Sequence, residues 1–359
     1  MLMFLARAIV CFAVTTLLLG GVSAAQDSRD SKQQLTFRTQ SNAVLVPALV
    51  RGKSGEIIYG LEAKDFIIED DGVEQVVHLD DAPEFPPVSL VVVIQLGRTA
   101  AAELPRIRTL GTMLDPVLSS GRNRCSIITF DGDVELTRPF TTNGALIAAD
   151  LERLRPGNHQ AAILDAVGYG VGLLKNEPKE RQRVLLLVSE TRDHGSHVVS
   201  IEDTVRAIAD SNTLVYTLAF SPSLSNTLDT WRGKTGKQEE PPRPEERTPE
   251  EIQSGQVMPD GTRRGAISIK SLLIMSAQAM RENTPKTIAA MTGGEYELFK
   301  SHAGFESRMM EFTNHLHNRY LLSFEPRDPH SGLHKIRVRL RQAATATVLA
   351  RDRYWAEVR

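Results

Sequence analysis

The sequence reads VSLVVVIQ at residues 88–95, a nearly unbroken apolar run without alternation of polar and apolar side chains. Further strand-like runs follow at residues 125–130 (CSIITF), 184–188 (VLLLV) and 214–220 (LVYTLAF). Stretches with helical spacing of apolar residues separate them, at residues 101–118, 145–154, 162–174 and 201–211. Apolar strands that alternate with helices are typical of a parallel sheet covered on both faces. We therefore predict a doubly wound, mostly parallel α/β domain.

On either side of this core the pattern changes to short β-type runs without intervening helices. They lie at residues 43–50 and 66–79 before the core, and at 320–324, 335–340 and 344–350 after it. We predict an N-terminal β-module at residues 36–85, an α/β domain at 87–319, and C-terminal strands at 320–359. Because strands flank one α/β block at both ends, we expect the two sets to pair as one small β-domain.

The predicted α/β domain contains an interruption. Residues 222–264 combine several prolines with a dense mixture of Glu, Arg and Lys, which buries too little apolar surface to offset ordering entropy. A disordered or loosely attached insertion is predicted there. The helical pattern resumes at residues 267–291, kinked or divided at Pro285, and continues with an edge strand at 295–299 and a helix at 305–318.

The first 25 residues have the features of a secretory signal peptide. Arg7 precedes an apolar run, and Val22-Ser23-Ala24 forms a small-x-small cleavage pattern. Cleavage would make the protein extracytoplasmic, either periplasmic or secreted. The alternative is an uncleaved membrane anchor, since residues 8–25 just reach spanning length. After cleavage only Cys125 would remain, which excludes an internal disulfide and favours a buried structural thiol.

The overall composition excludes several classes of function. The 359 residues include 42 Lys and Arg against 44 Asp and Glu, a net charge of −2, so the chain lacks the basic excess of a nucleic-acid-binding protein. No phosphate-binding loop and no glycine fingerprint follows Ile94, so no nucleotide cofactor is predicted.

Motifs in a particular order extend over most of the chain beyond the predicted signal. They include Lys64-Asp65-Phe66 and Glu69-Asp70-Asp71-Gly72, the strand at 87–94, Pro156-Gly157, Leu164-Asp165-Ala166, 184–189 with Asp193 and Ser196, Met291-Thr292-Gly293-Gly294, 319–324, 335–338, and Ala350-Arg351 with Tyr354. In this order the sequence resembles the VWA-related domain family of bacterial exported proteins, which have the von Willebrand factor type A fold. The resemblance implies extracytoplasmic binding or scaffolding.

Proteins of this fold often hold a divalent ion at the carboxyl ends of the parallel strands. The resemblance implies ligands from Asp-x-Ser-x-Ser after the first core strand, a Thr from a second loop and an Asp from a third, whose hard oxygens suit Mg²⁺ or Mn²⁺. This sequence departs from that pattern at most of these positions: Gln95, Gly97 and Thr99 in the first motif, Ala161 beside Gln160 in the second loop, and Glu190 in the third. We therefore predict a degenerate site that holds no divalent ion.

Two alternatives concern the same loops. Glu190, Thr99 and the amide oxygen of Gln95, with Asp131 or Asp193, would form a weak substitute site for Ca²⁺, which tolerates irregular geometry. Arg98 would place a fixed cation beside the altered position, where it pairs with Glu190 or receives a carboxylate from a partner. The simpler interpretation of Arg98 is a solvated loop side chain.

Several residues invite an enzymatic interpretation. Ser189, Asp193 and His194 lie within one short loop, whereas catalytic triads assemble from separate elements. His194 and His197 lack the helical context and third ligand of a zinc site. His315 and His317 would point to different faces of a helix, and Asp131-Gly132-Asp133 is first of all a hairpin turn. We predict no enzymatic activity, no cofactor and no small-molecule substrate.

The leading hypothesis is a non-enzymatic, extracytoplasmic protein-binding module of adhesion type. It would bind a protein partner, which the sequence does not name, through a rim of loops: Gln95, Gly97, Arg98, Thr99, Gln160, Ala161, Glu190 and Asp193. The alternative is a structural or scaffolding subunit that assembles by β-pairing at sheet edges. Membrane contact is expected only if the signal segment is not cleaved.

Overall fold

The computed structural model describes residues 43–80, 86–158, 160–220, 269–342 and 345–357. The predicted signal peptide at 1–25 and insertion at 222–264 lie outside the described residues, so both stay predictions. Among the residues that are described, no helix combines the length and the apolar character needed to cross a bilayer.

The larger sheet has the strand order β10-β9-β8-β5-β6-β7. Its strands are β5 (Val88–Gln95), β6 (Arg124–Phe130), β7 (Val134–Thr141), β8 (Gln182–Glu190), β9 (Leu214–Phe220) and β10 (Tyr296–Leu298). β7 is antiparallel to β6, and the other neighbours are parallel. Every residue of β5 is buried, as expected for a strand covered on both faces. The predicted α/β class with a mostly parallel sheet is confirmed.

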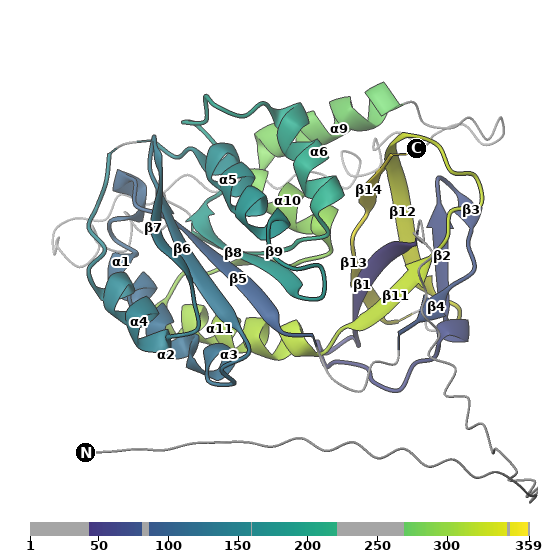
Figure 1. Ribbon diagram of the computed structural model, residues 1–359, viewed down its shortest axis with the longest axis horizontal. Coiled ribbons are helices and arrows are strands. Elements are labelled where there is room, and N and C mark those ends of the chain that lie inside the picture. The colour runs from purple at the N-terminus through teal and green to yellow at the C-terminus, as the bar shows by residue number, and fades with distance from the viewer. Residues whose placement is uncertain (1–42, 81–85, 159, 221–268, 343–344, 358–359) are drawn as a thin grey trace, which may run out of the picture. The chain divides into compact units, whose positions relative to one another are not determined.

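Helices cover both faces of this sheet, as Figure 1 shows. One face packs on α1 (Leu104–Ile107), α2 (Leu110–Met113), α3 (Asp115–Leu118), α4 (Gly144–Glu152) and α11 (His302–His317). The other packs on α5 (Ile163–Lys175), α6 (Ile201–Ser211), α9 (Ile269–Glu282) and α10 (Thr284–Thr292). Alternate residues of β5 supply the two cores, with Val92 on the first side and Val93 on the second.

The N- and C-terminal strands form two antiparallel sheets. One has the order β13-β1-β11-β4 and the other β14-β12-β2-β3. The strands are β1 (Val44–Arg51), β2 (Phe66–Asp70), β3 (Val73–Glu74), β4 (His78–Leu79), β11 (Tyr320–Phe324), β12 (Gly332–Leu340), β13 (Thr347–Ala350) and β14 (Arg353–Ala356). They enclose a separate core with Phe66 and Phe324. The predicted pairing of the terminal strands is confirmed, and we call these two sheets the β-domain.

One predicted helix and two strands differ from the sequence predictions. The helix predicted at 101–118 is divided into α1, α2 and α3, because Pro105 and Pro116 stand in the first turns of α1 and α3, where proline is tolerated. The strands β7 and β14 were not predicted. The helix predicted at 267–291 is divided, as one of the two predicted alternatives: α9 ends at Glu282, Asn283 caps α10 by accepting the N–H of Lys286, and Pro285 lies in the first turn of α10.

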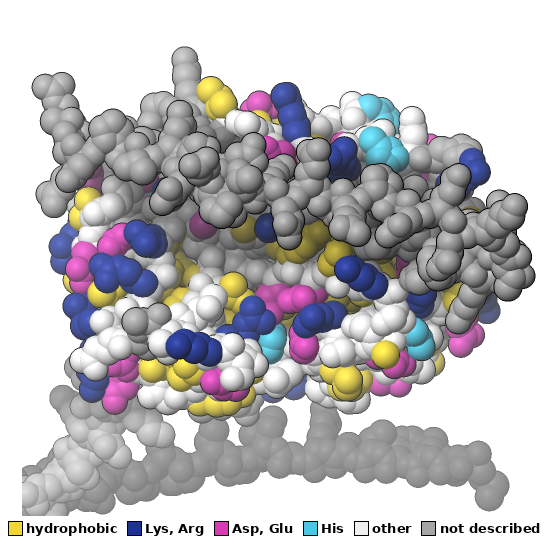
Figure 2. Space-filling view, turned by 180° about the vertical axis from the view of Figure 1, so that it is seen from behind, with side chains coloured by type: hydrophobic (Ala, Val, Ile, Leu, Met, Phe, Trp, Pro, Cys, Tyr) yellow, Lys and Arg dark blue, Asp and Glu magenta, His cyan; other side chains and the backbone are white. Residues whose placement is uncertain are grey.

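Charged side chains of both signs are interspersed on the described part of the face seen from behind in Figure 2. Charges mixed in this way form short-range ion pairs and do not create an extended surface potential of one sign.

Candidate functional site

Three side chains converge where β5 and β8 end, beside each other in the middle of the larger sheet. Gln95 is the last residue of β5, Glu190 is the last residue of β8, and Thr99 lies in the 3-10 turn η2 (Arg98–Ala100) after β5. The chain proceeds from β5 to β6 on one side and later to β8 on the other. Open α/β sheets bind their ligands outside the carboxyl ends of the strands at such a switch point.

The side-chain amide of Gln95 links the three residues. Its Nε2 donates to Glu190 Oε1 at 2.8 Å and to Thr99 Oγ1 at 3.0 Å, and its Oε1 accepts the backbone N–H of Glu190 at 2.8 Å. Because a backbone N–H can only donate, this last bond fixes which end of the amide carries oxygen. Gln95 is fully buried and Glu190 is 5% exposed, so the network is shielded from solvent.

His194 is a further partner of Glu190. Its Nε2 lies 2.8 Å from Glu190 Oε1, and Thr99 Oγ1 donates to the same oxygen at 3.2 Å. The backbone N–H of His194 donates to the carbonyl of Ala161 at 3.1 Å, which ties the loop after β8 to the second loop. Sequence reasoning missed this role of His194, because the spacing of four residues predicts a contact in a helix but not in a loop.

The second loop, which connects α4 to α5 and carries Gln160 and Ala161, lies directly against Gly97. A Cβ atom on Gly97 would stand 2.5 Å from the backbone oxygen of Gln160, so the serine of the family motif does not fit there. The backbone N–H of Arg98 donates to the carbonyl of Asn158 at 2.6 Å. Ala161 is buried, whereas Gln160 and Arg98 are exposed.

Arg98 does not take the place of the missing ion. Its side chain is exposed, and no ion pair joins it to Glu190 among the residues that the structure describes. The carboxylate of Glu190 contacts His194 Nε2 instead, at 2.8 Å. The guanidinium of Arg98 therefore belongs to the outer surface of the rim.

The nearby carboxylates hold the backbone of the rim. Asp193 Oδ1 accepts the N–H of Leu164 at 3.2 Å and the hydroxyl of Ser196 at 2.6 Å, which satisfies a free N–H in the first turn of α5. Asp131 Oδ2 accepts the N–H of Asn158 at 2.7 Å. Burial alone would raise the pKa of Asp131, but hydrogen bonds from backbone N–H groups, that of Asn158 first, lower it.

Asp165 has a similar role from within α5. It is 5% exposed and accepts the backbone N–H groups of His197, Val198 and Val199. The loop after β8 is therefore held by a buried carboxylate, and the rim is built before any partner arrives.

No family model and no curated protein matches the sequence. Among solved structures, the chain is similar to the conserved hypothetical protein BatB from Bacteroides thetaiotaomicron, at 16% identity over 64% of this chain and 98% of that chain, with a TM-score of 0.38. It is also similar to the SpRpn10 VWA domain, at 10% identity over 38% of this chain and 76% of that chain, with a TM-score of 0.30. A third similar structure is the PilB minor pilin from Streptococcus sanguinis, at 8% identity over 67% of this chain and 63% of that chain, with a TM-score of 0.42.

These likenesses are distant, so the assignment of the fold rests on the strand order and on the helices on both faces of the sheet. The larger sheet and the helices on its two faces have the von Willebrand factor type A (VWA) fold, and we call this part of the chain the VWA domain. The predicted resemblance is thus confirmed for the fold, and nothing about activity follows from it.

The donor set at the rim of the VWA domain does not fit a divalent ion. Mg²⁺ requires oxygen ligands in near-octahedral geometry, at about 2.0–2.1 Å. Here Gln95 directs an N–H group at both Thr99 and Glu190, and its oxygen is engaged by a backbone N–H. Of the carboxylates proposed to complete a substitute Ca²⁺ site with Glu190, Thr99 and Gln95, Asp131 Oδ2 and Asp193 Oδ1 each accept a backbone N–H.

The residues considered for catalysis have other partners. Ser189 is fully buried and its hydroxyl donates to the carbonyl of Glu190, not to His194. His197 Nδ1 lies 3.0 Å from the carbonyl of Gly195. His315 and His317 contact different groups, Glu295 and the carbonyl of Thr313. Asp131-Gly132-Asp133 forms the turn between β6 and β7.

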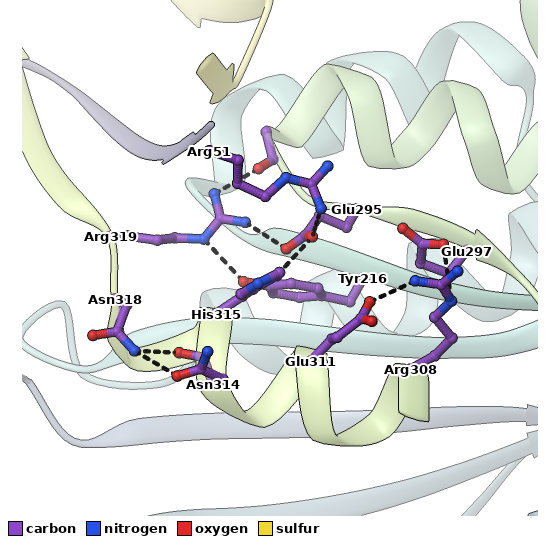
Figure 3. A network of polar contacts seen from close by, with 11 residues as sticks. Arg51, Tyr216, Glu295, Glu297, Arg308, Glu311, Asn314, His315, Asn318 and Arg319 are labelled. Carbon is purple, nitrogen blue, oxygen red and sulfur yellow. Dashed lines mark hydrogen bonds and ion pairs between the residues drawn. The ribbon is translucent and has the colours of Figure 1, made fainter. Parts of the chain in front are cut away.

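A second polar network, missed by sequence reasoning, centres on Glu295 (Figure 3). Glu295 Oε2 lies 2.8 Å from His315 Nδ1 in α11 and 3.4 Å from a guanidinium nitrogen of Arg51 in β1. Its Oε1 lies 3.3 Å from Arg319, which also donates to the hydroxyl of Tyr216 at 2.9 Å. The network therefore joins a strand of the β-domain to the VWA sheet and to α11.

Electrostatics favour the ionised form of Glu295. Burial alone would raise the pKa of its carboxyl, but the hydrogen bond with His315 and the charges of Arg319 and Arg51 lower it below the usual value. Burial raises the pKa of Tyr216 in the same network. Every member contacts protein groups, so we assign this network a structural role.

Proposed function

We propose that this protein is a non-enzymatic, extracytoplasmic protein-binding module of adhesion type whose rim binds its partner without a divalent ion. The observation that carries this proposal is the buried amide of Gln95, which satisfies Glu190 and Thr99 from within the protein. An ion bound there would have to displace these hydrogen bonds. The extracytoplasmic location is inferred from the signal-like sequence at residues 1–25.

The proposed partner presents an acidic side chain to Arg98. In VWA proteins with an ion, the open coordination position can take a partner's carboxylate, and here an exposed guanidinium stands beside the altered position. A separate hollow is lined by Gly132, Tyr169 and Val198, and the residues Tyr169 and Val198 are 43% and 76% exposed. Gly132 lies next to the side chain of Gln160 in the rim. A fixed, exposed cation suits an acidic anchor residue of the partner.

The test is site-specific photo-crosslinking in the producing cell. A photoreactive residue at Asn158, an exposed position of the second loop, is compared with one at Lys179, an exposed position before β8 at the opposite ends of the strands. The proposal predicts one crosslinked partner from position 158 only, in EDTA as well as in Mg²⁺.

The partner is then purified and titrated against the wild-type protein and the variants Arg98→Ala and Arg98→Lys. Loss of binding in Arg98→Ala, with partial retention in Arg98→Lys, is the expected result. Binding that needs Mg²⁺ or Ca²⁺, or that is unchanged in Arg98→Ala, would refute the proposal.

Assembly through sheet edges is the second hypothesis, and the described edges do not favour it. The edge strands β3 and β4 have two residues each, β10 has three, and β13 and β14 have four each. β7 is longer but contains Pro139 and two register shifts against β6. Short or irregular edges protect a sheet from pairing with another chain. Assembly that persists in Arg98→Ala would nevertheless support this hypothesis.

A further inference from the structure

The β-domain contains a cluster of potential metal ligands that is separate in sequence from the rim. Asp71 follows β2, His334 lies in β12, which pairs with β2, and His330 lies in the loop before β12. The side chain of His334 is 1% exposed, that of Asp71 is 23% exposed and that of His330 is 49% exposed. The cluster is therefore buried on one side and open to solvent on the other.

The distances in this cluster suit a tetrahedral ion. One ligand atom from each of the three residues lies within 4.8 Å of the others. His334 Nδ1 is 3.0 Å from Asp71 Oδ2, and His330 Nε2 is 3.8 Å from the same oxygen. Ligand atoms at about 2.0–2.1 Å around tetrahedral zinc are about 3.4 Å apart, between the two observed distances.

The second nitrogen of each histidine faces a backbone carbonyl. His334 Nε2 lies 2.9 Å from the carbonyl of His330, and His330 Nδ1 lies 3.1 Å from the carbonyl of Asp328. A carbonyl only accepts, so each of these nitrogens carries a hydrogen. His334 Nδ1 and His330 Nε2 are therefore the nitrogens that the rings would offer to an ion. Metal-binding histidines are generally oriented by such an outer hydrogen bond.

Other contacts hold the cluster in place. Asp71 adopts a left-handed φ of 48°, and its Oδ1 accepts the backbone N–H of Lys335 at 3.0 Å, which leaves Oδ2 for the histidines. The buried side chain of Gln75 accepts the N–H of Arg327 at 3.1 Å and anchors the loop that carries His330. Preorganised ligands of this kind reduce the entropy that is lost on binding.

A second carboxylate stands behind the cluster. Asp70, which is 5% exposed, has Oδ1 3.2 Å from His334 Nδ1, and its Oδ2 accepts the hydroxyl of Tyr354 at 2.9 Å. Asp70 and Asp71 together balance a charge of 2+ when both histidines are neutral. Two imidazoles and a carboxylate suit zinc, whereas Mg²⁺ and Ca²⁺ prefer oxygen ligands alone.

We propose that Asp71, His330 and His334 bind one zinc ion, with water at the open fourth position. The competing interpretation is a permanently protonated His334 that donates from Nδ1 to both aspartates and binds no metal. The site is independent of the proposed function, because it shares no residue with the rim.

Calorimetric titration of zinc into the purified, EDTA-treated protein tests the proposal. The variants are His330→Ala and Asp71→Asn; asparagine tolerates the left-handed backbone of residue 71 and removes only the charge. The control is His302→Ala, a half-exposed histidine of α11 that contacts Glu306. Circular dichroism verifies the fold of each variant.

We expect one zinc ion per chain in the wild type and in His302→Ala, and affinity at least about 10-fold lower in His330→Ala and Asp71→Asn. Failure of the wild type to bind stoichiometric zinc, or unchanged affinity in both cluster variants, would overturn the proposal. Zinc is also titrated into Glu190→Ala, to distinguish this site from the rim. Loss of zinc binding in Glu190→Ala, with binding retained in His330→Ala, would assign the zinc to Glu190 and His194 instead.

Discussion

Gln95 and Glu190 are joined twice: the amide nitrogen of Gln95 lies 2.8 Å from the carboxylate of Glu190, and the amide oxygen of Gln95 accepts the backbone N–H of Glu190 at 2.8 Å. The pair links the ends of two adjacent parallel strands in a buried environment. A neutral amide at this position removes the negative charge that a divalent ion would need and supplies the hydrogen bonds that Glu190 needs.

Replacing Gln95 by Glu should destabilise the protein. The substitution keeps the shape of the side chain but removes the two N–H donors and places a second carboxylate against Glu190. We expect a loss of about 2–4 kcal/mol in the free energy of unfolding at pH 7. Urea denaturation measures it, with Gln160→Glu as the exposed control within about 0.5 kcal/mol of wild type. Equal stability of the two variants would show that the Gln95 network contributes little.

Replacing Arg98 by Ala should leave stability almost unchanged. The side chain is exposed, and surface substitutions of this kind generally change the free energy of unfolding by less than about 0.5 kcal/mol. Any loss of partner binding in this variant would then report a contact and not a fold defect. A clear drop in the thermal midpoint of Arg98→Ala would contradict this prediction.

Glu295 should make stability depend on acid pH. Because its pKa is lowered in the folded protein, it contributes stability above the unfolded pKa near 4.5, and this is lost as pH falls through the folded pKa. Glu295→Gln should therefore flatten the dependence of unfolding free energy on pH below about 5. The control is Glu311→Gln, a partly exposed partner of Arg308. If the slope of unfolding free energy against pH were unchanged in Glu295→Gln, the network would not lower the pKa of Glu295 in the folded protein.

Cys125 should react only when the protein unfolds. Its thiol is fully buried in β6, and burial raises its pKa, so the reactive thiolate is scarce in the folded state. Alkylation at neutral pH, followed at this residue by peptide mass spectrometry, should proceed in urea and be negligible without it. Rapid labelling in native buffer would indicate that β6 opens readily.

The fold could be predicted where burial on both faces leaves an unbroken apolar run. β5, β8 and β9 are of this kind, and the approach of Gln95 to Glu190 follows from the rule that parallel strands end at one edge. β7 was missed because it is an edge strand with exposed positions and a proline, so its pattern differs little from a loop.

The polar clusters were less predictable, because their members are distant in sequence. Asp70 and His334 are 264 residues apart and meet only through the pairing of β2 with β12. His330 and His334 are only four residues apart, but their spacing alone does not predict a metal site. The third potential ligand, Asp71, is distant in sequence and is brought beside them by the fold. His194 likewise acquires its role from the loop that directs it at Glu190.

The measurement that bears most directly on the rim is thermal unfolding in EDTA and then with Mg²⁺ or Ca²⁺. An ion present at 100 times its dissociation constant would stabilise the folded state by about 2.7 kcal/mol, a shift of several degrees. We predict no shift, because Gln95 already satisfies Glu190 and Thr99. A shift of several degrees that disappears in Glu190→Ala would contradict a metal-free rim and would restore ion-dependent adhesion.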